Sequence, residues 1–173
     1  MPEWELRFEP GSIRSWAGRY AYGDDSAILE AGRRAQAARE FSHADFLLVC
    51  KWKSPRSQSK CSRNSSSEVV EITKIALTTQ IEHLRIGVLR CLHGVDWPTA
   101  SVLLHIAHPD PYPILDVRAL WSLGFDKKPN YYTFDLWMRY VQVCRQIATS
   151  QGVDMRTLDR AMWQYSKEHQ GSL

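Results

Sequence analysis

Residues 92–124 read LHGVDWPTASVLLHIAHPDPYPILDVRALWSLG, and this stretch decides the predicted fold. The turn at Gly94 is too short for an extended loop, so two helical segments must reverse direction there. Aspartate is a favoured N-cap, which suits Asp96 at the start of the second segment. Pro98 suits the first helical turn, where the amide that proline lacks has no partner in the helix. We therefore predict a tight hairpin of two helices over residues 80–108.

An acidic residue, Asp116, stands at the start of the next predicted helix. It follows Pro-Ile-Leu and precedes the apolar positions Val117, Leu120 and Leu123. An N-cap carboxylate is placed rigidly, because it accepts hydrogen bonds from the first amides of its helix. Capping alone explains this position, but the hairpin upstream makes it a candidate functional carboxylate as well.

Apolar residues recur at helical spacing through the rest of the chain. The predicted helices cover residues 26–41, 42–50, 66–77, 80–91, 133–152 and 154–165. Ser65 with Glu68, and Thr79 with Glu82, have the spacing of capping boxes. Strand-like alternation of useful length is lacking, so we predict an all-α fold of about eight or nine helices.

The composition favours one globular domain. The 173 residues are 44% hydrophobic and 24% charged, with a formal net charge of +3, so an anionic partner would meet a local basic patch. The four cysteines lack the paired spacing of a zinc knuckle and are expected to be reduced. No apolar stretch reaches the length of a signal peptide or a membrane span, which predicts a cytoplasmic protein without membrane association.

Residues 51–67, KWKSPRSQSKCSRNSSS, form a serine-rich basic segment without acids. We predict a loop. Its candidate phosphate contacts are Lys51, Lys53, Arg56 and Lys60, and Trp52 offers a ring on which a base can stack. A solvated surface loop without a ligand is the alternative.

The pattern Leu92-x-Gly-Val-x-x-x-Thr-Ala, followed one amphipathic helix later by Tyr-Pro-Ile-Leu-Asp116-Val-Arg, resembles the helix-hairpin-helix (HhH-GPD) superfamily of base-excision DNA glycosylases. The resemblance covers residues 79–124. It implies a compact helical fold of two small lobes around a cleft, with double-stranded DNA as the partner. We assign the lobes to residues 1–45 with 130–173 and to residues 46–129.

The resemblance also implies roles for individual residues. Asp116 matches the aspartate that stabilises positive charge on the sugar as the N-glycosidic bond breaks, and that orients the attacking water. The hairpin contacts to DNA would come from Gly94, Val95, Trp97 and Thr99. The candidates to line the base pocket or to stack on the base are Trp52, Tyr112, Trp121 and Trp163, although such aromatics are commonly core residues.

This sequence departs from the family pattern inside the hairpin. His93 replaces a proline, and Asp96 replaces a glycine and places an acid beside the predicted phosphate seat. Pro98 stands where strand-cleaving members carry a lysine, so the resemblance implies a monofunctional enzyme without a Schiff base. The family commonly holds a monovalent cation on hairpin carbonyls, and we predict no other cofactor and no metal site.

Two alternatives remain open at this stage. A non-catalytic DNA-binding module of the same fold would grip phosphate with the hairpin and use Asp116 only as a helix cap. A helical interaction protein would carry the hairpin by coincidence. We expect a monomer, and the sequence leaves the identity of the excised base open.

Overall fold

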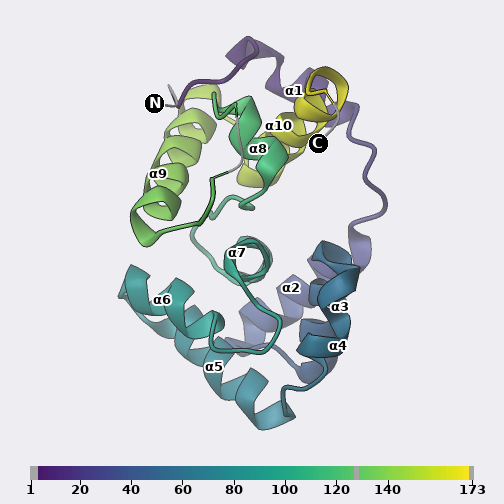
Figure 1. The fold of residues 1–173 in the computed structure, drawn as a ribbon, viewed down its shortest axis with the longest axis vertical. Helices are drawn as coiled ribbons and strands as arrows, with labels where there is room; N and C mark the ends of the chain where they lie inside the picture. Colours follow the sequence, from purple (N-terminus) through teal and green to yellow (C-terminus); the bar gives the residue numbers. More distant parts are fainter. Residues whose placement is uncertain (1–3, 127–128, 172–173) are drawn as a thin grey trace. The chain divides into compact units, whose positions relative to one another are not determined.

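A computed structural model describes residues 4–126 and 129–171. Regular secondary structure in these ranges is entirely helical, which confirms the predicted all-α class (Figure 1). The ten α-helices of the described ranges are α1 (Ile13–Gly18), α2 (Ser26–Ala38), α3 (His43–Lys53), α4 (Gln58–Cys61), α5 (Ser66–Thr78), α6 (Glu82–Leu89), α7 (Trp97–Ala107), α8 (Val117–Ser122), α9 (Phe134–Gln151) and α10 (Met155–His169). Two 3-10 helices, η1 (Pro10–Ser12) and η2 (Pro55–Ser57), precede α1 and α4.

Local side-chain caps start several helices where the sequence predicts them. Ser65 Oγ accepts the N–H of Glu68, whose carboxylate accepts the N–H of Ser65 at 2.7 Å, so the first capping box is confirmed. The second is wrong. Ile81 is the N-cap of α6 and has an extended backbone, and Thr79 Oγ1 accepts the Ile81 amide instead. The helix therefore begins two residues later than predicted, at Glu82.

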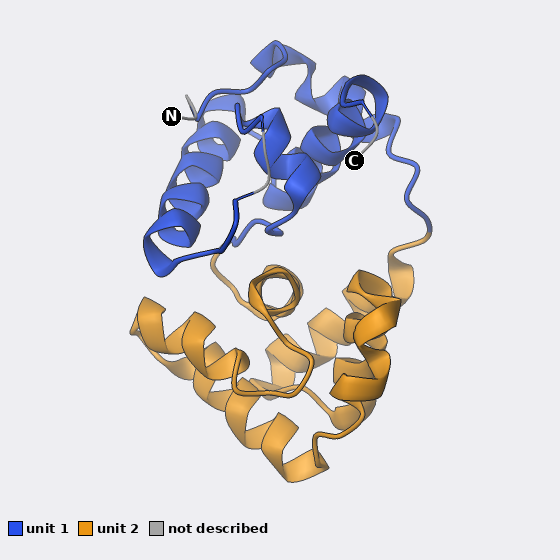
Figure 2. Ribbon diagram, viewed as in Figure 1, with its two compact units in different colours: residues 1–23, 111–173 blue, residues 24–110 orange. Residues whose placement is uncertain are grey.

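Contacts between helices divide the chain into two compact units (Figure 2). Unit 1 comprises residues 1–23 and 111–173, and unit 2 comprises residues 24–110. These boundaries differ from those of the predicted lobes, 1–45 with 130–173 and 46–129. Helix α2 belongs to unit 2 because it packs on α3 and α7, and α8 belongs to unit 1 because it packs on α10.

Unit 2 is built around α7, which packs on α2, α3 and α6. Its buried positions lie on all sides of the helix, as expected of a helix inside a core. A Cβ at Gly32 of α2 would lie 2.3 Å from the carbonyl oxygen of Ile106. Glycine at this position thus lets the backbones of α2 and α7 approach closely.

Unit 1 is built on α10, against which α1, α8 and α9 pack. Two hydrogen bonds fasten α8 inside this unit: Ser122 Oγ donates to the carbonyl of Met162 on α10, and the Arg7 amide donates to the carbonyl of Ser122.

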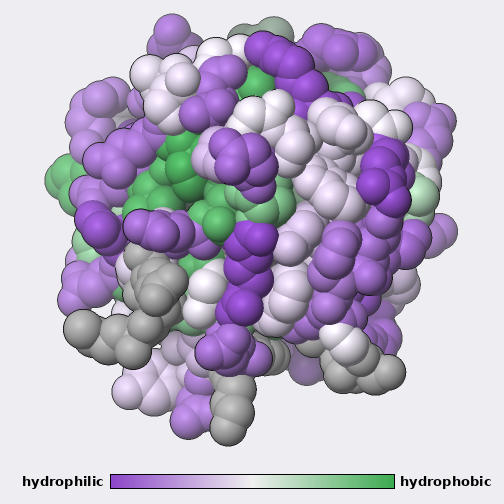
Figure 3. Space-filling model, turned by 90° about the horizontal axis from the view of Figure 1, so that it is seen from above, coloured by the Kyte–Doolittle hydropathy of each residue, from purple (hydrophilic) through white to green (hydrophobic). Residues whose placement is uncertain are grey.

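In Figure 3, hydrophilic residues cover most of the visible face and hydrophobic residues gather in one region of it. Within the described ranges, no helix combines the length and apolar character needed to cross a membrane.

Candidate functional site

The predicted hairpin is present in unit 2. Helix α6 ends at Leu89, the chain turns through Gly94, and α7 follows the N-cap Asp96. Gly94 has a φ of +79°, a left-handed conformation that favours glycine. A Cβ at this position would lie 2.7 Å from Cys61 Sγ and 2.9 Å from the main-chain nitrogen of Cys61. The turn therefore needs glycine both for its conformation and for its close packing on α4.

Asn64 holds the turn in place, a role that no sequence pattern indicated. Its side chain is buried, with Oδ1 accepting the N–H of His93 at 2.8 Å and Nδ2 donating to the carbonyl of His93 at 3.0 Å. Nδ2 also donates to the carbonyl of Cys61 at 2.8 Å. Both main-chain groups of His93 are thus engaged within the protein, which fixes the turn and withholds the His93 amide from a phosphate.

Arg90 offsets the acid that the hairpin carries. Asp96 Oδ1 accepts the N–H of Trp97 at 2.8 Å and Nε of Arg90 at 3.2 Å. The Arg90 guanidinium also lies 4.4 Å from the centroid of the Trp97 ring. Asp96 is therefore both a helix cap and half of an exposed ion pair, and its charge at the start of α7 is partly neutralised.

The basic segment 51–67 is mostly helical, so the loop prediction is wrong. Helix α3 continues through Lys53, and η2 and α4 follow. Serine hydroxyls donate to carbonyls three residues earlier, from Ser57 to Ser54 and from Ser62 to Ser59. The segment is anchored by the fully buried Cys61 and by Asn64 rather than by a repeating apolar face. Without that periodicity, the sequence carried no helical signal.

The predicted phosphate contacts of this segment occupy exposed or half-buried positions. Lys51, Arg56 and Lys60 are exposed, whereas Trp52 and Lys53 are half-buried. Lys60 Cβ would lie 3.0 Å from a Cβ placed on Gly94. The structure therefore brings Lys60 to the hairpin turn, where its positive charge would attract an anion.

Other charges and side chains at the hairpin limit how it can bind. The N–H of Ser65 donates to Glu68 and lowers the pKa of that carboxyl, which lies near His93 and keeps a negative charge there. The predicted contacts Val95, Trp97 and Thr99 have buried side chains, only 5–6% exposed. Any contact with DNA would fall to their main-chain groups, and the amides of Val95 and Trp97 already donate to Leu92 and Asp96.

Asp116 is the N-cap of α8, as predicted. Its Oδ1 accepts the N–H of Arg118 at 2.9 Å, and the residue is half-buried. The preceding segment, residues 111–115, is fastened to α9, because the Tyr140 hydroxyl donates to the carbonyl of Ile114 at 2.7 Å. The carboxylate is thus held rigidly and stays partly accessible.

The buried Tyr140 of α9 lies near Asp116, a proximity that the sequence did not indicate. Burial raises the pKa of Tyr140 well above its ordinary value, and nearby Cys144 and the negative charges of Asp159 and Asp116 raise it further. Asp159 is 4% exposed and forms an ion pair with Arg156. Tyr140 is therefore a neutral hydroxyl in a cluster with two carboxylates, contributed by α8, α9 and α10.

The predicted stacking residues of unit 1 have contrasting surroundings. Tyr112 is fully buried and stacks on Trp137 with centroids 5.7 Å apart. It is a core residue, which corrects its predicted role in binding a base. Trp121 is half-buried between Tyr165 and the guanidinium of Arg7. Trp163 is half-buried beside two tyrosines of the N-terminal segment.

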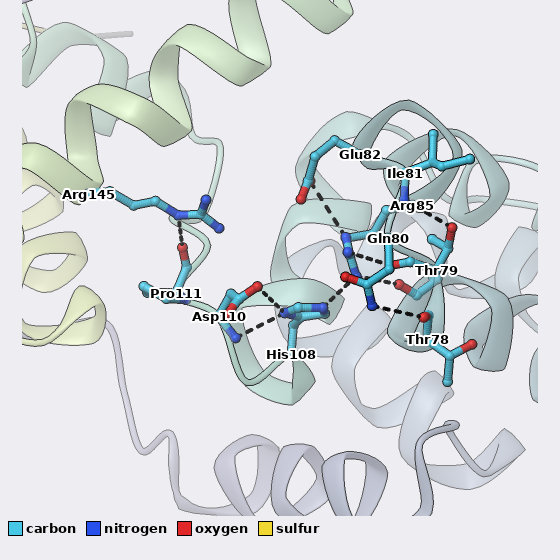
Figure 4. A network of polar contacts seen from close by, with 11 residues as sticks. Thr78, Thr79, Gln80, Ile81, Glu82, Arg85, His108, Asp110, Pro111 and Arg145 are labelled. Carbon is cyan, nitrogen blue, oxygen red and sulfur yellow. Dashed lines mark hydrogen bonds and ion pairs between the residues drawn. The ribbon is translucent and has the colours of Figure 1, made fainter.

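Within the described residues, no group of three or more His, Cys, Asp or Glu side chains that could hold a metal ion occurs. His108 joins a polar network around the buried Arg85 (Figure 4). Arg85 donates to the carbonyls of Ala76 and Thr79 at the end of α5. A pocket of about 430 Å³ lies against this network and is lined by residues of unit 2.

Protonation of His108 is expected to weaken unit 2. Its side chain is 6% exposed, and burial and then the charge of Arg85 lower the pKa below its ordinary value of 6.5, although Asp110 opposes the shift. As the pH falls, His108 is therefore protonated in the unfolded chain before it is protonated in the folded one. The free energy of unfolding keeps the full contribution of neutral His108 above pH 6.5 and decreases below it, by at most about 1.4 kcal/mol per pH unit. Urea unfolding at pH 7.5, 6.0 and 5.0 measures this, and His108→Gln is expected to flatten the dependence.

The exposed His83 of α6 supplies the matched control. His83→Gln should leave the pH dependence of unfolding as in the unmodified chain. Equal pH dependence in His108→Gln and in the unmodified chain would contradict the assignment.

The structure thus holds two separate candidate elements: the hairpin with Lys60 in unit 2, and Asp116 with its surroundings in unit 1. The first is a fixed main-chain turn, and the second is a rigidly held carboxylate. Comparisons with protein-family models, curated proteins and solved structures give no match to this chain.

Proposed function

We propose that this chain is a monofunctional DNA glycosylase with the HhH-GPD fold. It would hydrolyse the N-glycosidic bond of a damaged, modified or mismatched base that is extruded from double-stranded DNA. The observation that carries the proposal is the order of two local structures: a glycine turn between two helices, and then an N-cap carboxylate on the next helix.

The hairpin supplies the grip on DNA. In the first turn of α7, the N–H of Trp97 donates to Asp96 and Pro98 has none, which leaves the Thr99 amide without an acceptor in its own helix. The positive end of the helix dipole adds to the attraction of this amide for a phosphate. Lys60 begins beside the turn, and Arg90 offsets the charge of Asp96. Of the hairpin carbonyls that the family's monovalent cation would need, those of Leu92 and His93 each already accept one hydrogen bond, from Val95 and Asn64.

Asp116 supplies the chemistry. As the bond from the sugar to the base breaks, positive charge develops on the sugar, and a fixed carboxylate stabilises it. The same carboxylate takes a proton from water as its hydroxyl joins the sugar, and that proton then passes to the departing base, which leaves as the neutral free base and regenerates the carboxylate. Pro98 has no amine to form a Schiff base, so the DNA strand stays intact after hydrolysis.

The rival function is a non-catalytic DNA-binding module. It is favoured by the hydrogen bond that already occupies Asp116 Oδ1 and by the negative charge of Glu68 near the hairpin. It shares the DNA contacts of the enzyme but releases no base.

The deciding experiment incubates the purified chain with duplexes that each carry one lesion: uracil, hypoxanthine, an alkylated base, an oxidised base or a 5-modified pyrimidine. Strand breaks that form only after alkali treatment support the monofunctional enzyme. Duplex binding without base release on any lesion supports the module, and no binding at low salt overturns both. Breaks without alkali, with a borohydride-trapped adduct, would show that a lysine elsewhere forms a Schiff base.

Lys60→Gln is expected to weaken duplex binding and to reduce the slope of log affinity against log salt by about 0.9, the value for one lost phosphate contact. The measurement is fluorescence anisotropy with an undamaged duplex between 50 and 200 mM salt. Lys74→Gln removes an exposed cation from α5 with the same change in net charge, and it should keep the slope. Equal slopes in the two variants would exclude Lys60 from the interface.

A further inference from the structure

A short segment of unit 1 is fastened onto α10 through the main chain of Ala21. The Ala21 amide donates to Gln164 Oε1 at 3.1 Å, and its carbonyl accepts from Lys167 Nζ at 3.3 Å. On either side of this anchor, Tyr20 and Tyr22 stack with centroids 6.4 Å apart and an interplanar angle of 29°. Their position is therefore set by α10.

Trp163 of α10 meets both tyrosines edge to face. The centroid distances are 5.3 Å to Tyr20 and 5.4 Å to Tyr22. Tyr22 is 44% exposed, and the other two rings are half-buried. We call these three residues the aromatic face. In contrast to the buried Tyr112, they offer ring surface to a ligand.

Four cationic side chains surround the aromatic face. Lys167 Nζ and Arg118 Cζ lie 5.2 and 5.6 Å from the Trp163 centroid. Arg156 and Arg160 Cζ lie 5.2 and 5.4 Å from the Tyr20 centroid.

Nearby acids balance only part of this charge. Asp159 pairs with Arg156, and the charge of Arg160 acts on the Asp154 carboxylate and lowers its pKa. Glu168 pairs with Arg19, whose guanidinium lies over a different ring, Trp16. The aromatic face therefore combines exposed rings with a local excess of positive charge.

We propose that the aromatic face binds an unpaired nucleic-acid strand, with a base stacked on the exposed Tyr22 and phosphates beside Arg160 and Lys167. Every base has a flat π-face that can stack on an aromatic ring, and cations neutralise the backbone between bases. A duplex hides those faces between neighbouring base pairs, so the rings select an unpaired strand. An acidic protein partner would use the cations but not the rings. The inference is independent of base release by Asp116.

The test measures anisotropy of a fluorescein-labelled twelve-nucleotide oligo-dT with the full chain at low salt. Tyr22→Ala is expected to weaken binding about tenfold, because it removes one stacking ring. Tyr22→Phe keeps the ring and should bind like the unmodified chain. The control is Tyr131→Ala, which removes a tyrosine that is 75% exposed on the same unit. Equal losses in Tyr22→Ala and Tyr131→Ala would overturn the proposal.

Two further comparisons separate stacking from charge. An abasic twelve-mer, which keeps the phosphates, is expected to bind at least about tenfold more weakly than oligo-dT. Lys167→Gln should lower the salt slope by about 0.7, whereas Arg139→Gln on α9 should not. Equal binding of the two oligonucleotides, or displacement of oligo-dT by deca-glutamate at matched charge, would overturn the proposal.

Asp116→Asn separates this proposal from the glycosylase. The variant should keep its affinity for oligo-dT, whether or not the unmodified chain releases a base. A parallel loss of oligo-dT binding in Asp116→Asn would count against a separate surface.

Discussion

Asp116→Asn is expected to slow base release by about a thousandfold while duplex binding stays within about twofold of the unmodified chain. The substitution removes the negative charge that stabilises the sugar in the transition state and that accepts the proton of water. It keeps the helix cap, because an asparagine Oδ1 also accepts the N–H of Arg118 and asparagine is as good an N-cap as aspartate. Single-turnover release from the best lesion duplex measures the rate, and anisotropy measures the affinity.

Asp154→Asn is the matched control for this experiment. Asp154 is the N-cap of α10 in the same unit and accepts the N–H of Thr157 at 2.7 Å. The same chemical change at an equivalent cap should leave base release unchanged. If both variants lose activity equally, or if Asp116→Asn keeps full activity, the catalytic role of Asp116 is refuted and the capping role is sufficient.

Gly94→Ala is expected to lower the free energy of unfolding by about 3 kcal/mol and to weaken duplex binding at least about tenfold. Alanine is strained at a φ of +79°, and its Cβ would collide with Sγ and the main-chain nitrogen of Cys61. Because α4 cannot accommodate that Cβ, the turn must move, and with it the amides at the start of α7. Urea unfolding followed by circular dichroism measures the first effect, and anisotropy the second.

Gly152→Ala separates backbone conformation from packing. Gly152 ends α9 with a φ of +58°, but a Cβ there would meet no atom within 4 Å. Its replacement should lower the free energy of unfolding by only about 1 kcal/mol, the cost of a left-handed backbone at alanine, and should leave duplex binding unchanged. Equal destabilisation by the two substitutions would show that Cys61 yields to the Gly94 Cβ and that the packing is less strict than the geometry indicates.

Helix starts were predictable from the sequence where one residue caps its own helix. Asp96, Asp116, Thr133 and Asp154 each accept an amide hydrogen bond from a residue one to three positions later. Thr79 shows the limit of the pattern, since its spacing fits a cap but the chain stays extended to Ile81. The spacing of two residues does not show whether the backbone between them is helical or extended, because the tertiary structure decides this.

The candidate site was predictable in part. The glycine turn and the N-cap aspartate follow from local sequence, but the basic segment was wrongly predicted as a loop because Cys61 and Asn64 provide no periodic signal. The sequence did not show which of Tyr112 and Tyr22 is buried, since both are tyrosines near prolines or glycines. One is fully buried against Trp137 and the other is 44% exposed.

The sequence by itself determined the all-helical class, the turn at Gly94 and the caps at Asp96 and Asp116, because these depend on interactions within a few residues. Only the tertiary structure decided that Asn64 holds the turn and that Tyr140 lies near both Asp116 and Asp159. Those arrangements depend on contacts between residues far apart in the chain, and a single sequence does not specify which distant side chains meet.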